Sequence, residues 1–136
     1  MLTYGDGVSD IDLNALLAQH EASGKLVTLT GIQPGGRFGV LDLDESGRTV
    51  TGFREKAKED GGWINGGFMV MEPEVFNYLS EDESCILERV PMERLAADGA
   101  LGIYKHNGFW QCMDTHRDKI WLEDRWASGN TPWRIW

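Results

Sequence analysis

A helical stretch followed directly by an apolar strand constrains the fold of this chain more than any other feature. Residues 10–23 begin with two acids and carry side chains at helical spacing, namely Leu13, Leu16, Leu17 and His20. Gly24 comes directly after this pattern and is typical of a helix C-terminus. Residues 26–30 then form a β-rich run. With residues 2–4 as the end of an earlier strand, the pattern predicts a strand, helix, strand unit.

The rest of the chain continues this alternation of helices and strands. Residues 39–44 and 48–55 are β-rich and are separated by Glu45-Ser46-Gly47, which predicts an antiparallel hairpin. Strands are predicted for residues 63–71 and 101–106, and helices for residues 74–79, 86–98 and 117–127. This pattern predicts an α/β sheet with an antiparallel part. Because neither a repeat nor a low-complexity linker interrupts it, we expect one domain over residues 1–136.

The composition excludes several classes of protein. The chain is 41% hydrophobic and 26% charged, as in globular proteins. Its formal net charge of -9 argues against nucleic acid as a partner, because phosphate binding needs clustered Lys and Arg. No stretch approaches the roughly 18 apolar residues of a membrane span, so we expect no membrane partner. The first residues lack the features of a secretory signal, and we therefore expect a cytoplasmic protein.

Cysteine and histidine give little indication of chemistry. Cys85 and Cys112 lack the spacing of a zinc site and the density of a disulfide scaffold, and we interpret both as buried or idle. His116 has no second clustered ligand. No arrangement of Ser, Cys and His indicates a nucleophilic triad.

Two aspartates are candidates for one divalent metal ion. Asp6 follows the short first strand, and the carboxyl end of a strand is where α/β sheets place ligands. Asp114 follows the run Phe109-Trp110-Gln111-Cys112-Met113. Each has a structural alternative: an Asp-Gly turn for Asp6, and the N-cap of the last helix for Asp114. These alternatives are compatible with metal binding.

Four motifs resemble one family in content and in order. TYGDGVSD, FREK, INGGF and FWQCMDTHRDK resemble the second half of a sugar-1-phosphate nucleotidyltransferase, and are most similar to those of the glucose-1-phosphate cytidylyltransferases. The resemblance runs from Leu2 to Trp136. In that family a glycine-rich loop of the GGxGTRL kind holds the triphosphate and precedes these motifs, and this sequence contains no such loop. The resemblance therefore implies a truncated Rossmann-like sheet, which we expect to be completed by oligomerisation.

The resemblance also implies roles for particular residues. Asp6 and Asp114 match the family's Mg²⁺ pair, and Lys56 matches its catalytic anchor for the sugar phosphate. Glu55, Asn65 and Gly66 match residues that contact the sugar, as Lys56 does. The alternatives are a solvated charge run around Lys56 and a β-bulge at the glycines. Ala57 stands where the family commonly has proline, which leaves Lys56 less firmly placed.

These roles imply conversion of CTP and glucose 1-phosphate to CDP-glucose and pyrophosphate. Without the triphosphate loop we expect the isolated chain to be inactive, unless a complementary N-terminal chain supplies that half. The alternative is a non-catalytic binding or structural module. Open sheet edges and six tryptophans predict a homo-oligomer, a dimer or larger.

Overall fold

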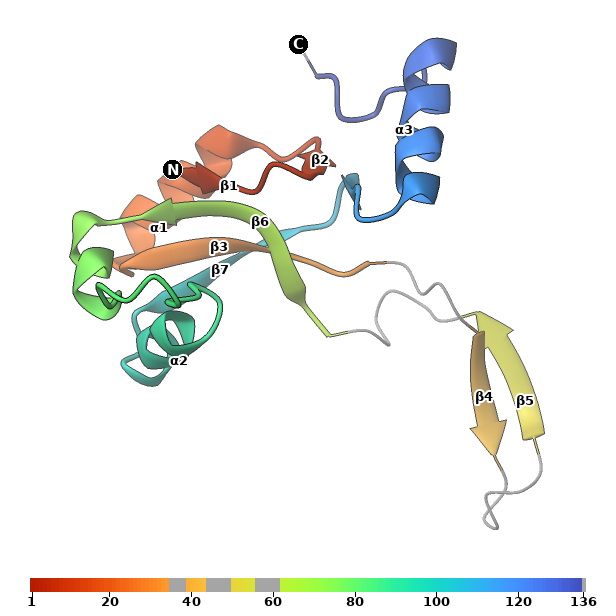
Figure 1. Ribbon diagram of the computed structural model, residues 1–136. Helices are drawn as coiled ribbons and strands as arrows, with labels where there is room; N and C mark the ends of the chain where they lie inside the picture. Colours follow the sequence, from red (N-terminus) through yellow and green to blue (C-terminus); the bar gives the residue numbers. More distant parts are fainter. Residues whose placement is uncertain (35–38, 44–49, 56–61, 136) are drawn as a thin grey trace.

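A mixed sheet forms the centre of the molecule. The computed structural model describes residues 1–34, 39–43, 50–55 and 62–135 (Figure 1). Four strands run in the order β1 (Leu2–Thr3), β6 (Ile64–Met71), β3 (Val27–Ile32) and β7 (Leu101–His106). β6 is antiparallel to both β1 and β3, whereas β3 and β7 are parallel. The parallel register pairs Ile32 with His106, so both strands end at the same edge of the sheet.

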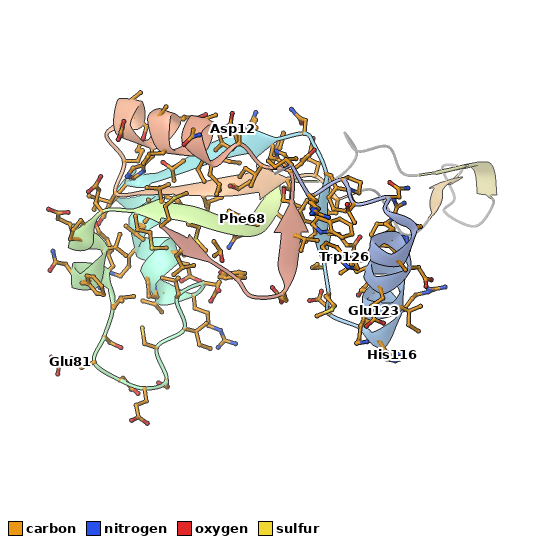
Figure 2. The ribbon with its side chains drawn as sticks, turned by 90° about the horizontal axis from the view of Figure 1, so that it is seen from above. Asp12, Phe68, Glu81, His116, Glu123 and Trp126 are labelled. Atoms are coloured by element: carbon orange, nitrogen blue, oxygen red, sulfur yellow. The ribbon has the colours of Figure 1, made fainter. Side chains whose placement is uncertain are left out.

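Two helices cover opposite faces of this sheet (Figures 1 and 2). α1 (Leu13–Ser23) packs Leu16 against Val70 and Ile11. α2 (Val90–Ala97) lies on the other face, where Leu95 joins a cluster that contains Met69. Met69 and Val70 are neighbours on one strand, and successive strand side chains point to opposite faces. The alternation of strand residues therefore builds two separate cores.

Local sequence signals explain the bounds of the helices. The Asp12 side chain accepts a hydrogen bond from the Ala15 N–H at 2.9 Å, so the predicted helix begins after Asp12 and not at residue 10. Gly24, with φ of 62°, ends it. The helix predicted for residues 86–98 is only Val90–Ala97, because Pro91 suits the first turn of a helix and not its interior. A 3-10 helix, η2 (Pro73–Tyr78), replaces the helix predicted for residues 74–79.

A small ribbon and a C-terminal helix complete the described part of the chain. β2 (Gly7–Ser9) and β8 (Trp110–Cys112) pair as an antiparallel ribbon that the sequence did not predict. α3 (His116–Ser128) follows it. Its N-cap is Thr115 and not Asp114, because Thr115 and Asp118 form a complete capping box.

The predicted hairpin is confirmed in β4 (Gly39–Leu43) and β5 (Val50–Glu55). Its antiparallel register pairs Gly39 with Glu55. In Figure 1 the hairpin lies apart from the four-stranded sheet. The predicted α/β class with an antiparallel hairpin is therefore correct. Within the ranges given above, no helix has both the length and the apolar character that crossing a membrane requires.

Candidate functional site

The β2–β8 ribbon brings the two predicted metal aspartates together. The Met113 N–H donates to the Asp6 carbonyl at 2.8 Å, next to the pair Gly7 and Cys112. Asp6 is thus opposite Met113, and Asp114 is the next residue along the chain. Both aspartates are exposed at the same end of the ribbon. Residues from the two ends of the chain therefore form one acidic corner.

The Asn65-Gly66-Gly67 segment of β6 lies directly against this ribbon. The Trp110 indole N–H donates to the Gly66 carbonyl at 2.8 Å. Asn65 donates from Nδ2 to the Tyr4 hydroxyl at 3.2 Å and accepts from the Gly67 N–H at 2.9 Å. These bonds tie β6 to Tyr4 and to Trp110, which precede Asp6 and Asp114, respectively. The structure thus joins three of the four motifs.

The Glu55 and Lys56 motif is not joined to the others in the described residues. Glu55 is the last residue of β5, and only its backbone is described. Lys56 lies outside the described residues. Their roles on the sugar and the phosphate therefore remain predictions. The described candidate site consists of Asp6, Asp114, Asn65 and Gly66.

Tyr4 links this site to an acid that sequence reasoning missed. Its hydroxyl donates to Glu88 Oε1 and accepts from Asn65. Burial raises the pKa of Tyr4 to about 12, with the hydrogen bond to Glu88 and its negative charge adding to the shift. Tyr4 therefore stays neutral at physiological pH and can hold Asn65 and Glu88 at once. Glu88 lies in the turn before α2, within the helix predicted for residues 86–98, and no local pattern there points to such a contact.

The half-buried Cys112 is hydrogen bonded to the metal candidate Asp114. Its thiol donates to Asp114 Oδ2 at 3.1 Å. Burial raises the pKa of Cys112 to about 11, and the hydrogen bond and charge of Asp114 act in the same direction. The thiol therefore reports on the charge at Asp114.

We expect Asp114→Asn to accelerate alkylation of Cys112. With a pKa of about 11, only about one thiol in a thousand is ionised at pH 8. Removing the carboxylate charge lowers that pKa, and we expect a roughly threefold or greater rate increase. Iodoacetamide labelling followed by peptide mass spectrometry measures this rate, with Cys85 as the internal standard. Asp124→Asn on α3 makes the same charge change elsewhere, and equal rates in both variants would contradict the prediction.

The donor chemistry of the aspartate pair fits Mg²⁺. This ion prefers oxygen ligands and commonly takes one or two protein carboxylates, keeping water and phosphate for its other positions. In the part of the chain that the structure describes, no group of three or more His, Cys, Asp or Glu side chains could hold a metal. A pair of exposed carboxylates leaves the coordination sites that a phosphate-bound Mg²⁺ needs.

Several known proteins are similar to this chain. Glucose-1-phosphate cytidylyltransferases from Salmonella typhi and Salmonella typhimurium are each 47% identical over 136 residues, 100% of this chain. The chain spans 52% of the length of each. A Bacillus anthracis crystal structure, assigned as a glucose-1-phosphate thymidylyltransferase in complex with a sucrose, matches 85% of this chain and 49% of its own. Its TM-score of 0.56 at 19% identity supports the fold alone.

The family itself follows from a direct match. The model of the family described as nucleotidyl transferase matches residues 1–111. That range contains β2, β6 and most of β8, which together position Asp6, Asn65 and Gly66. The chain therefore belongs to the nucleotidyl transferase family.

Proposed function

We propose that this chain supplies the metal and sugar-phosphate side of a nucleotidyltransferase site that converts CTP and glucose 1-phosphate to CDP-glucose and pyrophosphate. The observation that carries the proposal is the β2–β8 ribbon, which joins Asp6 and Asp114 beside Asn65 and Gly66. The similarity to cytidylyltransferases supports glucose 1-phosphate and CTP as substrates.

The main requirement of this reaction is neutralisation of the negative charge on the phosphates, and not covalent catalysis. A phosphate oxygen of the sugar phosphate attacks the α-phosphorus of CTP, and the bond from that phosphorus to the departing pyrophosphate oxygen breaks. The attacking group is already an anion, so repulsion between phosphates is the main barrier. When bound, Mg²⁺ would neutralise part of this charge. Asp6 and Asp114 would hold the ion, and Lys56 would bind the sugar phosphate.

Asn65 and Gly66 would shape the hexose subsite. The oxygen and one N–H of the Asn65 amide are already engaged by Gly67 and Tyr4, so its second N–H is available for a hydroxyl. Gly66 is buried, and a Cβ there would lie 3.1 Å from the Ile32 Cγ2 atom. A side chain at Gly66 would therefore displace the strand end that the hexose approaches.

The triphosphate needs a further binding element. The sequence contains no GGxGTRL loop, and the chain spans about half the length of the cytidylyltransferases that it matches. We therefore propose that full activity requires a triphosphate-binding loop that these 136 residues do not contain, and that the 136 residues alone turn over very slowly.

Exposed apolar side chains on α3 favour a second candidate function, an oligomeric structural module. Ile120 is 45% exposed, Trp121 is 36% exposed and Trp126 is 57% exposed. Aromatic side chains of this size are common at protein interfaces. A second copy of the chain would bury them.

Ligand-dependent melting distinguishes the two functions. We expect glucose 1-phosphate with Mg²⁺ to stabilise the protein by about 1.4 kcal/mol at ten times its Kd. Lys56→Ala should abolish this shift, whereas Lys58→Ala, in the same segment but outside the motif, should retain it. Glucose 6-phosphate tests for nonspecific phosphate binding. A folded protein that no ligand stabilises, and that light scattering shows to be an oligomer, would overturn the nucleotidyltransferase proposal in favour of the structural module.

A further inference from the structure

We infer that Asp10 is a positioning residue for the candidate site. With Ser9, His106, Gly108 and Phe109 it forms what we term the Asp10 clamp, which fixes the β2–β8 ribbon and hence the relative position of Asp6 and Asp114. The motif roles described above do not include Asp10 or His106. Only the link from the ribbon to a bound metal rests on the proposed function.

Asp10 holds one residue, Phe109, through both its side chain and its backbone. Its Oδ1 atom accepts from the Phe109 N–H at 2.7 Å, and its own N–H donates to the Phe109 carbonyl at 3.2 Å. The same Oδ1 lies 2.9 Å from His106 Nε2. One carboxylate oxygen therefore joins the end of β7 to the segment that leads into β8.

Ser9 and His106 complete the clamp around the Phe109 carbonyl. The Ser9 hydroxyl donates to this carbonyl at 2.7 Å, and His106 Nε2 lies 3.1 Å from it. Because Asp10 Oδ1 and the Phe109 carbonyl are both acceptors, Nε2 carries the hydrogen. The His106 side chain is only 8% exposed. Breaking these part-buried bonds would leave polar groups with reduced access to water and without their partners, which is costly.

At Gly108 the segment between β7 and β8 lies very close to the Asp10 side chain. A Cβ at this position would lie 2.4 Å from Asp10 Oδ1 and 2.7 Å from His106 Cε1. Real Cβ atoms essentially never approach other atoms this closely, so a side chain at residue 108 would push the Asp10 or His106 side chain out of its position. The close approach of the Gly108 backbone therefore supports the clamp in addition to the side-chain hydrogen bonds.

The clamp holds one end of the β2–β8 ribbon in place. The ribbon has three residue pairs, from Gly7 with Cys112 to Ser9 with Trp110. A two-stranded ribbon of this size is not stable by itself. The clamp closes the end at Ser9 and Trp110, whereas Asp6 and Asp114 project from the opposite end. Loss of the clamp should therefore let the two aspartates move relative to each other.

Hydrogen exchange of the ribbon amides tests the inference without any ligand. We expect Asp10→Ala to speed exchange over β8 about tenfold or more, because two charge-assisted contacts are lost. Asp10→Asn retains an oxygen acceptor and should restore most of the protection. Asp12→Ala removes a carboxylate that also accepts one backbone N–H, but at the start of α1, and should leave β8 unchanged. The amides of β3 report whether the sheet stays folded.

Manganese affinity, measured by electron paramagnetic resonance, then connects the clamp to the site. Asp10→Ala should weaken Mn²⁺ binding about threefold to tenfold, and Asp10→Asn should restore it. Unchanged exchange over β8 in Asp10→Ala would overturn the inference. If Asp10→Ala does not fold, Ser9→Ala decides in its place, since it leaves the Asp10 carboxylate and removes the hydroxyl that contacts the Phe109 carbonyl, His106 Nε2 and the Ile11 N–H. A wild-type chain that binds no Mn²⁺ would overturn the proposed metal site, and the exchange result would still decide the clamp.

Discussion

Replacement of Gly67 by alanine is expected to lower the free energy of unfolding by roughly 3 kcal/mol. Gly67 has a φ of +79°, which strains any residue with a Cβ, and that Cβ would lie 2.9 Å from the Tyr4 ring. Movement of the ring would also weaken the bonds from Tyr4 to Asn65 and Glu88. Urea denaturation followed by circular dichroism measures the change.

Gly99→Ala separates backbone strain from the collision with Tyr4. Gly99 has a φ of +65°, and a Cβ there would meet nothing within 4 Å. Strain alone should cost about 1 kcal/mol at this position. If the two variants lose equal stability, the close approach of Gly67 to Tyr4 contributes nothing, and the structural account of this corner is wrong.

Elements with strong local signals could be predicted from the sequence. The apolar spacing around Leu16 and the glycine at 24 predicted α1 nearly to its ends. Glu45-Ser46-Gly47 between two β-rich runs predicted the pairing of β4 and β5. In both cases the residues that determine the structure lie within one turn or one hairpin of each other. Such signals do not depend on the rest of the fold.

The β2–β8 ribbon could not be predicted in this way. Each of its strands has three residues, too few to show a period, and its partners come from the two ends of the chain. The turn that Gly7 predicted at Asp6 is present, and β2 begins directly after it, but a turn does not indicate the partner of the strand that follows. The resemblance to nucleotidyltransferases associated Asp6 with Asp114 through a common ligand, but it did not indicate the backbone pairing that brings them together.

Polar contacts over long sequence distances explain what was missed at the site. Glu88, Asp10 and His106 resemble ordinary surface residues in the sequence, because nothing local distinguishes a paired charge from a solvated one. Glu88 contacts Tyr4, and Asp10 contacts Phe109 and His106. The two residues of each of these pairs are far apart in the sequence. Only the folded sheet reveals that these residues support the segments carrying Asp6 and Asp114.

Replacement of either Asp6 or Asp114 by asparagine is expected to weaken Mn²⁺ binding about tenfold or more, which is the largest effect that we predict for the site. Each substitution keeps the size of the side chain and removes one anionic oxygen ligand. Because both residues are exposed, neither change should alter the melting temperature by more than a degree or two. Titration of Mn²⁺ by electron paramagnetic resonance measures the affinity, with Asp124→Asn as the charge control.

The double variant shows whether the two aspartates share one ion. If both carboxylates hold the same metal, the double substitution should lose less affinity than the sum of the single losses, because an ion already deprived of one ligand is held weakly. Two separate sites would instead appear as two bound Mn²⁺ ions in the wild type, one of which is lost in each single variant. Such a result would contradict the proposal that Asp6 and Asp114 hold one shared ion, and would leave the acidic corner intact as a structure.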